Sequence, residues 1–360
     1  MKIGFFDYCL NYRGTTRAIH QYCKILLSDS NTQDCTFFFE AENKFNALKA
    51  ARLFTDIGVS IQPIASREEL MHTNLDFLYH VTSGDQLQND WIEHISCSNV
   101  LIHQVGYQPP HQTKHKLVYT SYWQSYYLSS FRTDVLPYIV EVDVNEHMSQ
   151  AECRRELGIP EDAIVLGRHG GYDTWNLGFV NDVVKHVVMN TGQNIYFLFM
   201  NTPMFIVNEK RAIFLPGSHE INKLNRFFCA CDAMLHARWE GETFGMACAE
   251  FLFRKKPIIS WIESRERNHI LMADRSLIGY NGPSDLYLIL TNLTRSFLEH
   301  KSRLIDISVL QALYSPEAVK PKLRQLITSY TNKDITSRRV WTTQEIAKGR
   351  DPETHAPVLN

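Results

Sequence analysis

Short apolar runs alternate with longer amphipathic stretches along most of the chain. The run at residues 2–8 has the length and composition of a buried strand, and 15–29 repeats apolar side chains at helical spacing. Further strand-like runs follow, with another helix-length stretch at 44–58. Strands that alternate with helices of about 10–15 residues form βαβ units and a parallel sheet. The alternation therefore predicts the α/β class.

The alternation stops once and then begins again. Pro137 interrupts an apolar stretch, and polar sequence follows it before a new helix-length stretch at 149–159. A chain of 360 residues also exceeds what one core usually holds. We therefore predict two Rossmann-like, doubly wound domains, 1–143 and 144–330, that face a central cleft. The polar tail, 331–360, is predicted either to cross back over the first domain or to fray.

The charge balance and the cysteines exclude several protein classes. With 37 basic and 39 acidic residues, the net charge of −2 argues against a protein held on nucleic acid by phosphate contacts. No apolar run approaches about 18 residues, so we predict no membrane span and at most peripheral membrane contact. Asp7 interrupts the first apolar run, which is unlike a secretory signal, and eight cysteines in so long a chain do not form a disulfide scaffold. We expect reduced thiols and a cytoplasmic protein.

Two carboxylates stand eight positions apart in the stretch RWEGETFGMACAE, residues 238–250. Glu242 is predicted to lie in the turn after a strand, and Glu250 about two turns along the next helix, 244–255. Backbone N–H groups at the start of that helix attract phosphate, and a glycine there lets a ligand approach closely. An acid on each side of a phosphate site fits the layout of a sugar–diphosphate–nucleoside. Alternatively, Glu242 is a helix-start acid and Glu250 lies on a solvated face.

The segment ETFGMACAE resembles the Glu-x7-Glu signature of retaining GT-B glycosyltransferases, particularly those of family 4. Three further segments resemble other motifs of that family and stand in the same order along the chain: RRELGIPEDAIVLGRHGG, EINKLNRFFCACDAMLHAR and KKPIISW. The resemblance is dense over 137–262 and thinner before it. It implies the GT-B fold, with the acceptor on the side of the first domain and a nucleotide-sugar donor on the side of the second.

The resemblance implies roles for residues of the second domain. Glu250 would bind the ribose hydroxyls of the donor, Glu242 would lie beside the transferred sugar, and Arg168 would pair with the diphosphate. Many family members carry a lysine shortly after that arginine, whereas this chain has Thr174 and Asn176 there. The other donor-side candidates are the glycine turn after Arg168, one carboxylate and the helix start: Gly170, Gly171, Asp173, Thr243, Phe244, Gly245 and Met246. Alternatively, Arg168 is a surface arginine after a strand.

The resemblance also marks residues at strand ends in the first domain. Gly14 resembles the glycine of the family's first loop, and Arg13 would add positive charge beside it. His103 resembles the family's histidine near the reacting carbon, and His80, which ends another strand, is a second candidate near the sugar or acceptor. The alternatives are an ordinary turn at Gly14 and packed histidines at both strand ends. Aromatic residues at 119–131 either line an acceptor groove by stacking on sugar rings or pack in the core.

These features predict a retaining glycosyltransferase that moves a hexosyl or pentosyl group from a UDP- or GDP-sugar to a glycan, glycoconjugate or other hydroxyl acceptor. The chain contains no Asp-x-Asp, so we expect turnover without a metal or other cofactor, with Arg168 and a helix N-terminus stabilising the leaving group. Two other functions stay open: a non-catalytic sugar-nucleotide or glycan-binding protein on the same fold, and a sugar-nucleotide epimerase. A dinucleotide oxidoreductase is disfavoured because 5–14 lacks Gly-x-Gly-x-x-Gly.

Overall fold

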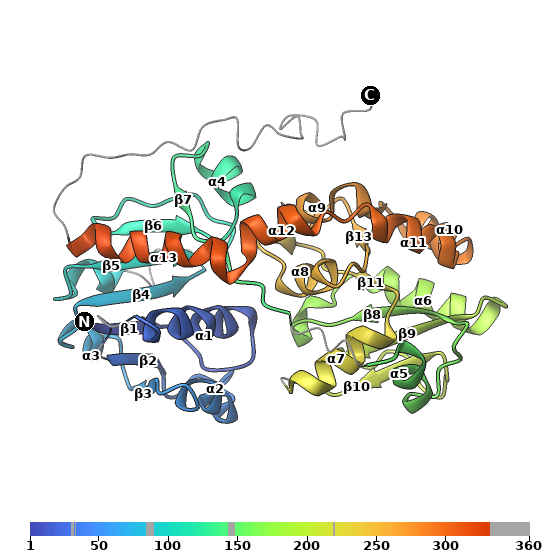
Figure 1. The fold of residues 1–360 in the computed structure, drawn as a ribbon, viewed down its shortest axis with the longest axis horizontal. Coiled ribbons are helices and arrows are strands. Elements are labelled where there is room, and N and C mark those ends of the chain that lie inside the picture. The colour runs from blue at the N-terminus through green and yellow to red at the C-terminus, as the bar shows by residue number, and fades with distance from the viewer. Residues whose placement is uncertain (30–31, 33, 84–89, 143–147, 219, 332–360) are drawn as a thin grey trace.

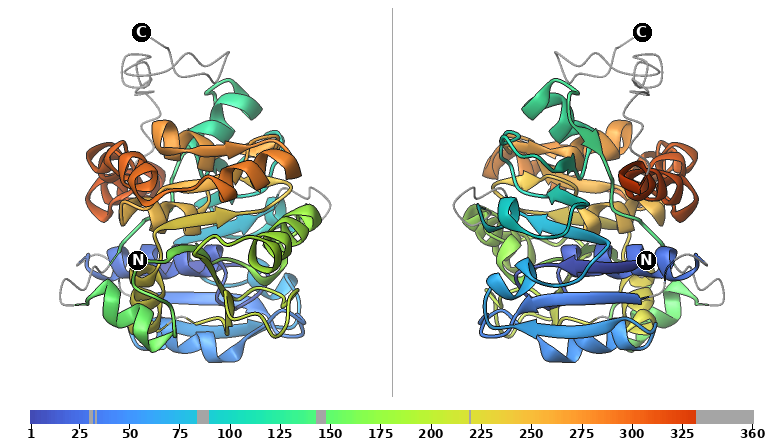
Figure 2. Two further views of the ribbon diagram at one scale, coloured as in Figure 1. Left: turned by 90° about the vertical axis from the view of Figure 1, so that its right-hand side faces the viewer. Right: turned by 90° about the vertical axis from the view of Figure 1, so that its left-hand side faces the viewer.

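Two parallel β-sheets, each covered by helices, make up the molecule. The computed structural model describes residues 1–29, 32, 34–83, 90–142, 148–218 and 220–331. In this part of the chain, seven strands form one sheet and six form the other, and every strand pair in them is parallel (Figure 1). Figure 2 shows helices on both sides of the stacked strands. The predicted α/β architecture of two doubly wound sheets is confirmed.

The first sheet has the strand order β3-β2-β1-β4-β5-β6-β7. Its strands are β1 (Lys2–Phe6), β2 (Asp34–Glu40), β3 (Ser60–Ile64), β4 (Phe77–Thr82), β5 (Val100–Gln104), β6 (Lys116–Tyr119) and β7 (Asp134–Val135). The helices of this half are α1 (Gly14–Leu27), η1 (Leu48–Ala50), α2 (Ala51–Thr55), α3 (Glu68–Met71), η2 (Asp90–His94) and α4 (Tyr122–Ser129). The central strands β4 and β5 are buried along their whole length, as expected for parallel strands that are covered on both faces.

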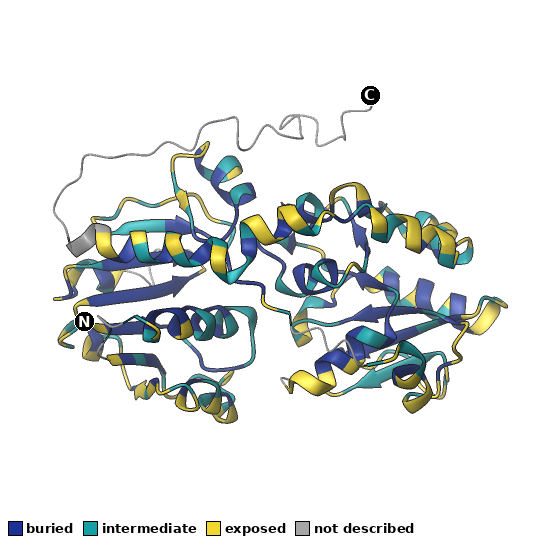
Figure 3. Cartoon of the chain, viewed as in Figure 1, coloured by how far each residue is buried: buried dark blue, intermediate teal, exposed yellow. Residues whose placement is uncertain are grey.

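The second sheet has the order β10-β9-β8-β11-β13-β15. Its strands are β8 (Ile164–Arg168), β9 (Ile195–Met200), β10 (Ala212–Leu215), β11 (Ala233–His236), β13 (Ile258–Trp261) and β15 (Ile278–Tyr280). A separate short pair joins β12 (Gly241–Glu242) to β14 (Glu266–Arg267). The helices are α5 (Gln150–Glu156), η3 (Tyr172–Thr174), α6 (Gly178–Asn190), α7 (Ile221–Ala230), α8 (Met246–Phe253), α9 (Asn268–Ala273), η4 (Asp274–Ser276), α10 (Pro283–Thr291), α11 (Arg295–Arg303), α12 (Ile307–Tyr314) and α13 (Pro316–Thr331). Figure 3 shows the strands largely buried and exposed residues on the outer side of α13.

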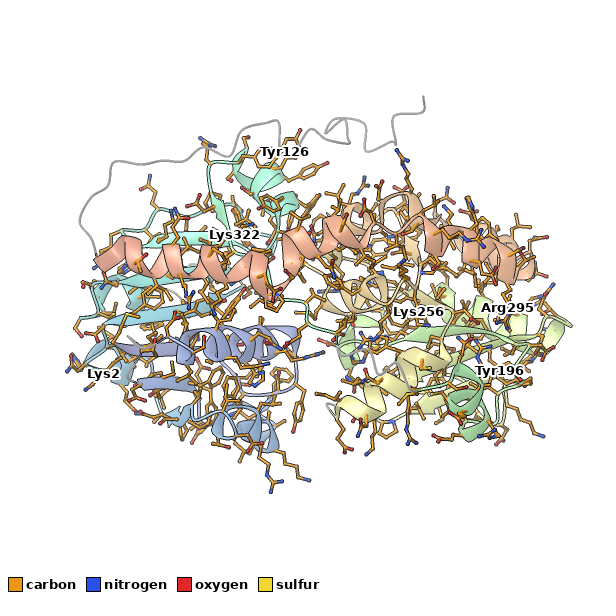
Figure 4. The ribbon with its side chains drawn as sticks, viewed as in Figure 1. Lys2, Tyr126, Tyr196, Lys256, Arg295 and Lys322 are labelled. Atoms are coloured by element: carbon orange, nitrogen blue, oxygen red, sulfur yellow. The ribbon has the colours of Figure 1, made fainter. Side chains whose placement is uncertain are left out.

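The last described helix, α13, returns to the first domain. It follows the second sheet in sequence but runs along the first domain and packs against α1 (Figure 1). Its Lys322 lies over the first domain in Figure 4, and the Lys322 Nζ donates to the Tyr122 hydroxyl at 2.7 Å. Arg324 on the same helix forms an ion pair with Asp29. Helix α13, which the sequence placed within the second domain, therefore packs on the first.

Two sequence-based predictions concern residues that the structure does not describe. The expected domain boundary at 143/144 lies within 143–147, and the expected polar tail lies, apart from its first residue, within 332–360. Both ranges fall outside the described residues. Of the helices in the described ranges, none combines the length and the apolar character needed to cross a lipid bilayer.

Candidate functional site

Loops from the two domains meet at the carboxyl ends of the central strands. A β-carbon built on Gly14, the first residue of α1, would lie 3.8 Å from the Cβ of Met246, the first residue of α8. Beside them, an Nη2 of Arg13 lies 3.9 Å from the Oδ2 of Asp173, in the turn that follows β8. The N-terminus of a first-domain helix therefore faces the N-terminus of a second-domain helix. Both helix ends carry partial positive charge.

Glu250 is a buried carboxylate at this junction. Its side chain is 5% exposed, although it lies on α8, and the Nη2 of Arg17 in the first domain approaches its Oε1 to 2.7 Å. Its Oε2 makes no hydrogen bond within the described residues and lies 3.6 Å from the Nε2 of His169. Burial acts to raise the pKa of Glu250, but Arg17, His169 and Arg254 outweigh it and lower the pKa. Glu250 is therefore an ionised group rather than part of a solvated helix face.

His169 follows Arg168 at the end of β8 and was not singled out from the sequence. Its side chain is 14% exposed, and its Nδ1 has no hydrogen-bond partner among the described residues. Burial is the main reason that the pKa of His169 falls to about 4, and Glu250 acts in the opposite direction. The imidazole is therefore neutral near pH 7 and can donate or accept one hydrogen bond beside Glu250.

Arg168 is buried, and both of its Nη groups donate to protein acceptors. Only 3% of the residue is exposed, which excludes a surface arginine. One Nη donates to the Asn201 carbonyl at 2.6 Å and the Thr202 Oγ1 at 3.0 Å, and the other donates to the Gly171 carbonyl at 2.5 Å and the Thr174 Oγ1 at 2.8 Å. Burial lowers the pKa of Arg168 to about 10, against the opposing effect of Glu242 and Asp173. The guanidinium thus links the turn after β8 to the end of β9 through hydrogen bonds.

The turn that Arg168 holds contains the other predicted residues of this loop. The Gly170 carbonyl accepts a hydrogen bond from the Asn201 Nδ2 at 2.9 Å, and Gly171 precedes the short helix η3. Asp173 on η3 has a side chain that is 72% exposed and faces Arg13. The loop is therefore positioned at its base by Arg168 and open to solvent at its tip.

Glu242 lies on β12 within a cluster of polar side chains. Its Oε2 accepts a hydrogen bond from the Arg238 Nη1 at 2.8 Å, and its Oε1 lies 3.3 Å from the His236 Nε2. Burial acts to raise the pKa of Glu242, but the charge of Arg238 and the hydrogen bond from His236 outweigh it and lower the pKa to about 2. The Ser260 hydroxyl joins His236 to His269, at 2.9 Å and 3.0 Å. Sequence reasoning found only Glu242 of this cluster.

The start of helix α8 differs from the sequence-based prediction. The helix begins at Met246 rather than at Phe244, because Gly245 adopts a left-handed conformation with φ of 89°. Thr243 and Phe244 therefore precede the helix, and the Phe244 ring packs against the rings of Tyr138 and Tyr314 at centroid distances of 5.0 Å and 5.3 Å. Of the four residues predicted at the helix start, only Met246 belongs to the helix, and Gly245 caps it.

His103 lies inside the first domain. The residue has no exposed surface, its Nδ1 is hydrogen-bonded to the Tyr79 hydroxyl, and its ring lies 5.6 Å from that of Tyr138. Burial lowers the pKa of His103 to about 3, so the imidazole is neutral. Since Tyr138 also contacts Phe244, one aromatic ring separates His103 from the loop that carries Glu242.

His80 is packed, whereas the aromatic segment is partly packed and partly exposed. His80 is 4% exposed and stacks on Phe6 at a centroid distance of 5.3 Å. In α4, Trp123 is 2% exposed, whereas Tyr127 and the following Phe131 are 41% and 43% exposed. Of the aromatic side chains considered for an acceptor groove, some therefore pack in the core and others are exposed to solvent.

Asp7 is a further buried carboxylate at a strand end. From the sequence it served only as an argument against a signal peptide. It follows β1 directly and is fully buried. Burial raises the pKa of Asp7 to about 6, although the Thr15 hydroxyl, the backbone of Tyr8 and Cys9 and the charge of Arg13 act to lower it. An acidic residue directly after a largely apolar strand was the sequence signal for this position.

The first domain contains a polar cavity of about 520 Å³. It opens at the carboxyl ends of β2 and β3 and combines carboxylates with an aromatic ring; its lining residues are Glu40, Glu42, Asn43, Ala65, Ser66, Arg67, Glu68 and Trp91. In the described part of the chain, no three His, Cys, Asp or Glu side chains gather closely enough to hold a metal ion.

Comparison with known proteins identifies the fold. No family model and no curated protein sequence matches the chain. The structure of Anabaena HepE in complex with UDP-glucose is similar to it with a TM-score of 0.72 at 12% identity, over 91% of this chain and 100% of that one. The chain has the GT-B fold. Two further structures share it: sucrose-phosphate synthase from Thermosynechococcus elongatus (TM-score 0.64, 11% identity, 92% and 99% covered) and WaaG, a glycosyltransferase involved in lipopolysaccharide biosynthesis (0.59, 15%, 89% and 99%).

The GT-B fold explains why the candidate residues meet. Open α/β sheets bind ligands in the crevice outside the carboxyl ends of their strands. In this GT-B chain, Asp7 and Arg13 follow a strand of the first sheet, whereas Arg168 ends β8 and Glu242 follows β11 in the second. All four residues therefore lie at the carboxyl ends of strands, where the Arg13–Asp173 and Arg17–Glu250 pairs join the two domains.

Proposed function

We propose that the chain is a retaining glycosyltransferase that uses a nucleoside diphosphate sugar, with UDP as the nucleotide, and needs no metal. The acceptor is a hydroxyl of a glycan or glycoconjugate. One observation carries the proposal: Glu250 is ionised and buried, and its Oε2 has no hydrogen bond within the described residues. An unsatisfied buried carboxylate oxygen costs free energy, which hydroxyl groups of a bound ligand recover. HepE, on the same fold, has been solved with UDP-glucose and with UDP and glucose.

The two acids then bracket the donor. Glu250 accepts hydrogen bonds from the ribose hydroxyls, and Glu242, which remains ionised down to about pH 2, lies on the side of the transferred sugar. Between them, Gly245 and the N-terminus of α8 approach the diphosphate, where free backbone N–H groups favour negative charge. Arg168 contributes by holding the Gly170–Gly171 turn in place, so its role in this proposal is positioning.

The transfer step follows from this arrangement. The bond between the sugar's anomeric carbon and the phosphate oxygen breaks, and a bond from the acceptor hydroxyl oxygen forms on the same face. The proton of that hydroxyl passes to the departing phosphate oxygen. Helix N-termini and arginines stabilise the negative charge on the leaving nucleoside diphosphate within a cleft that excludes water. The polar cavity of the first domain supplies carboxylates and the Trp91 ring for a sugar acceptor.

Thermal unfolding with a panel of nucleotides and nucleotide sugars tests the proposal. A ligand that binds only the folded protein raises the unfolding temperature by mass action. We expect UDP and at least one UDP-sugar to do so, and release of UDP from that sugar in the presence of EDTA. NMR of the product should show a retained anomeric configuration. Binding without any UDP release would indicate a binding protein, and conversion of the sugar within intact UDP-sugar would indicate an epimerase.

A further inference from the structure

Among the described residues of the second domain, the cation that the family resemblance marks for the diphosphate is already engaged. Both Nη groups of Arg168 donate to protein acceptors. The two residues that stand near the position of the family's lysine are neutral and engaged: the Thr174 hydroxyl binds the Gly171 carbonyl, and the Asn176 side chain binds Glu240 and the Trp239 amide. Two phosphate groups in a dry cleft nevertheless need positive charge close by.

The first domain offers that charge. Arg13 precedes α1 and Arg17 lies one turn further on, so the two side chains share a helix face. Both reach across to the second domain: Arg13 approaches Asp173 to 3.9 Å, and Arg17 contacts Glu250 at 2.7 Å. Their side chains are 37% and 35% exposed, so both are partly open to solvent rather than enclosed in the core.

We propose that Arg17, supported by Arg13, is the cationic ligand of the donor's diphosphate and that Glu250 holds it ready in the ligand-free protein. This inference rests on the proposed function. Arg17 lies beside the carboxylate that takes the ribose, and ribose and diphosphate are neighbours in a nucleoside diphosphate. When the ribose hydroxyls bind Glu250, the guanidinium moves by rotation about its own side-chain bonds onto the phosphate oxygens. There its planar fork makes paired hydrogen bonds.

A purely structural clamp between the domains predicts something different. If Arg17 only joined the domains, its removal would weaken all cleft ligands together. If Arg17 moves from Glu250 to phosphate, its removal weakens only phosphate-bearing ligands. A nucleoside without phosphate should then bind as well or better, because Glu250 no longer has a competing partner. The sign of the effect on the nucleoside separates the two cases.

Calorimetric titration of the full chain with uridine, UMP and UDP provides the test, and guanosine, GMP and GDP form the parallel series. The variants are Arg17→Gln and Arg17→Lys, and Lys24→Gln is the matched control, since Lys24 lies on α1 in an exposed pair with Glu141. We expect Arg17→Gln to weaken the binding of UDP about tenfold or more. The same variant should bind uridine as tightly as the wild type or more tightly. The affinity of Arg17→Lys for UDP should lie between those of the wild type and Arg17→Gln. The control should bind like the wild type.

Two results would overturn the inference. In one, Arg17→Gln binds UDP within twofold of the wild type. In the other, uridine and UDP weaken by the same factor while circular dichroism shows an intact fold. Both results leave the proposed function standing, because the wild type still binds UDP. Absence of nucleoside diphosphate binding to the wild type in both series would instead overturn the proposed function, and this inference with it.

Discussion

The Nη2 of Arg17 lies 2.7 Å from the Oε1 of Glu250, so an arginine of the first domain is paired with a buried carboxylate of the second. Arg17 belongs to the helix after β1, and Glu250 belongs to the helix that follows β11 and β12. A ligand that replaces Arg17 at the Oε1 of Glu250 breaks a contact between the domains, whereas Oε2 makes no hydrogen bond within the described residues. In the proposed donor complex, a ribose hydroxyl at Oε1 would therefore compete with this contact between the domains.

Arg168→Lys should lower the stability of the protein and its affinity for UDP. A lysine cannot replace the fork that binds both Asn201 and Gly171, and carbonyl groups are left without donors in a buried site. We expect the free energy of unfolding in urea to fall by about 3 kcal/mol. Arg303→Lys, in an exposed pair on α11, is the control and should be neutral. A neutral Arg168→Lys would show that the buried fork is not needed to hold the turn.

Asp7→Asn should stabilise the protein at alkaline pH. The pKa of Asp7 is about 6 in the folded protein against an ordinary value of 3.8, so the folded state holds the proton more tightly. The free energy of unfolding therefore falls as the pH rises from about 4 to 6. Removing the charge should raise it by about 2–3 kcal/mol at pH 8 and by less at pH 4.5.

Urea unfolding at both pH values measures this effect. Asp182→Asn, at an exposed position of α6, is the control and should change little at either pH. An equal gain from Asp7→Asn at both pH values, or a loss at pH 8, would contradict the assigned pKa.

Glu242→Gln should have the opposite pH dependence. The pKa of Glu242 is about 2 in the folded protein against an ordinary 4.5, so its ionised form stabilises the fold above pH 4.5 and this contribution disappears as the pH falls toward 2. The variant should lose on the order of 2 kcal/mol at pH 7 and less at pH 3.5. Chemical unfolding at the two pH values checks this, and a loss that does not depend on pH would point to packing instead of charge.

Gly241→Ala should disturb the loop that carries Glu242. Gly241 has φ of 79°, and a β-carbon there would lie 1.9 Å from the Glu266 carbonyl oxygen. We expect a loss of on the order of 2 kcal/mol or more in the free energy of unfolding. Gly192→Ala is the matched control, because a β-carbon at that loop glycine meets nothing within 4 Å. If the two variants proved equally stable, the close approach of β12 and β14 at this glycine would be wrong.

The sequence predicted the fold because strands buried on both faces are continuous apolar runs, and these runs alternate with stretches of helical periodicity. Of the two alternatives left open for Glu250, the apolar neighbours Ala249, Phe251 and Leu252 argue against a solvated face, and the structure shows the residue buried. The predicted helix at 44–58 is present only as η1 and α2, over 48–55. Its first turns are replaced by a loop, since the Asn46 side chain binds the Leu10 amide and the Glu40 carbonyl.

The contacts of the candidate site could not be predicted in the same way. His236, Ser260 and His269 come from β11, β13 and α9, and each looks ordinary in its own segment. Their hydrogen bonds, and the pair between Arg17 and Glu250, join residues that are far apart along the chain. The resemblance marked Arg168 and His103 as residues close to the donor. In the structure, both Nη groups of Arg168 donate to protein acceptors, and His103 is buried inside the first domain. The roles of Arg168 and His103 in donor binding or catalysis therefore stay predictions.

Calorimetry with UDP and 2′-deoxy-UDP, on the wild type and on Glu250→Gln, tests most directly whether the ribose binds Glu250. If a ribose hydroxyl donates to this carboxylate, loss of the 2′-hydroxyl or the Glu250→Gln substitution should each weaken binding about tenfold. The two changes combined should weaken binding little more than either one alone. Glu299→Gln, at an exposed site, is the control. Independent, multiplying effects of the two changes, or wild-type affinity for UDP in Glu250→Gln, would contradict a donor site at Glu250.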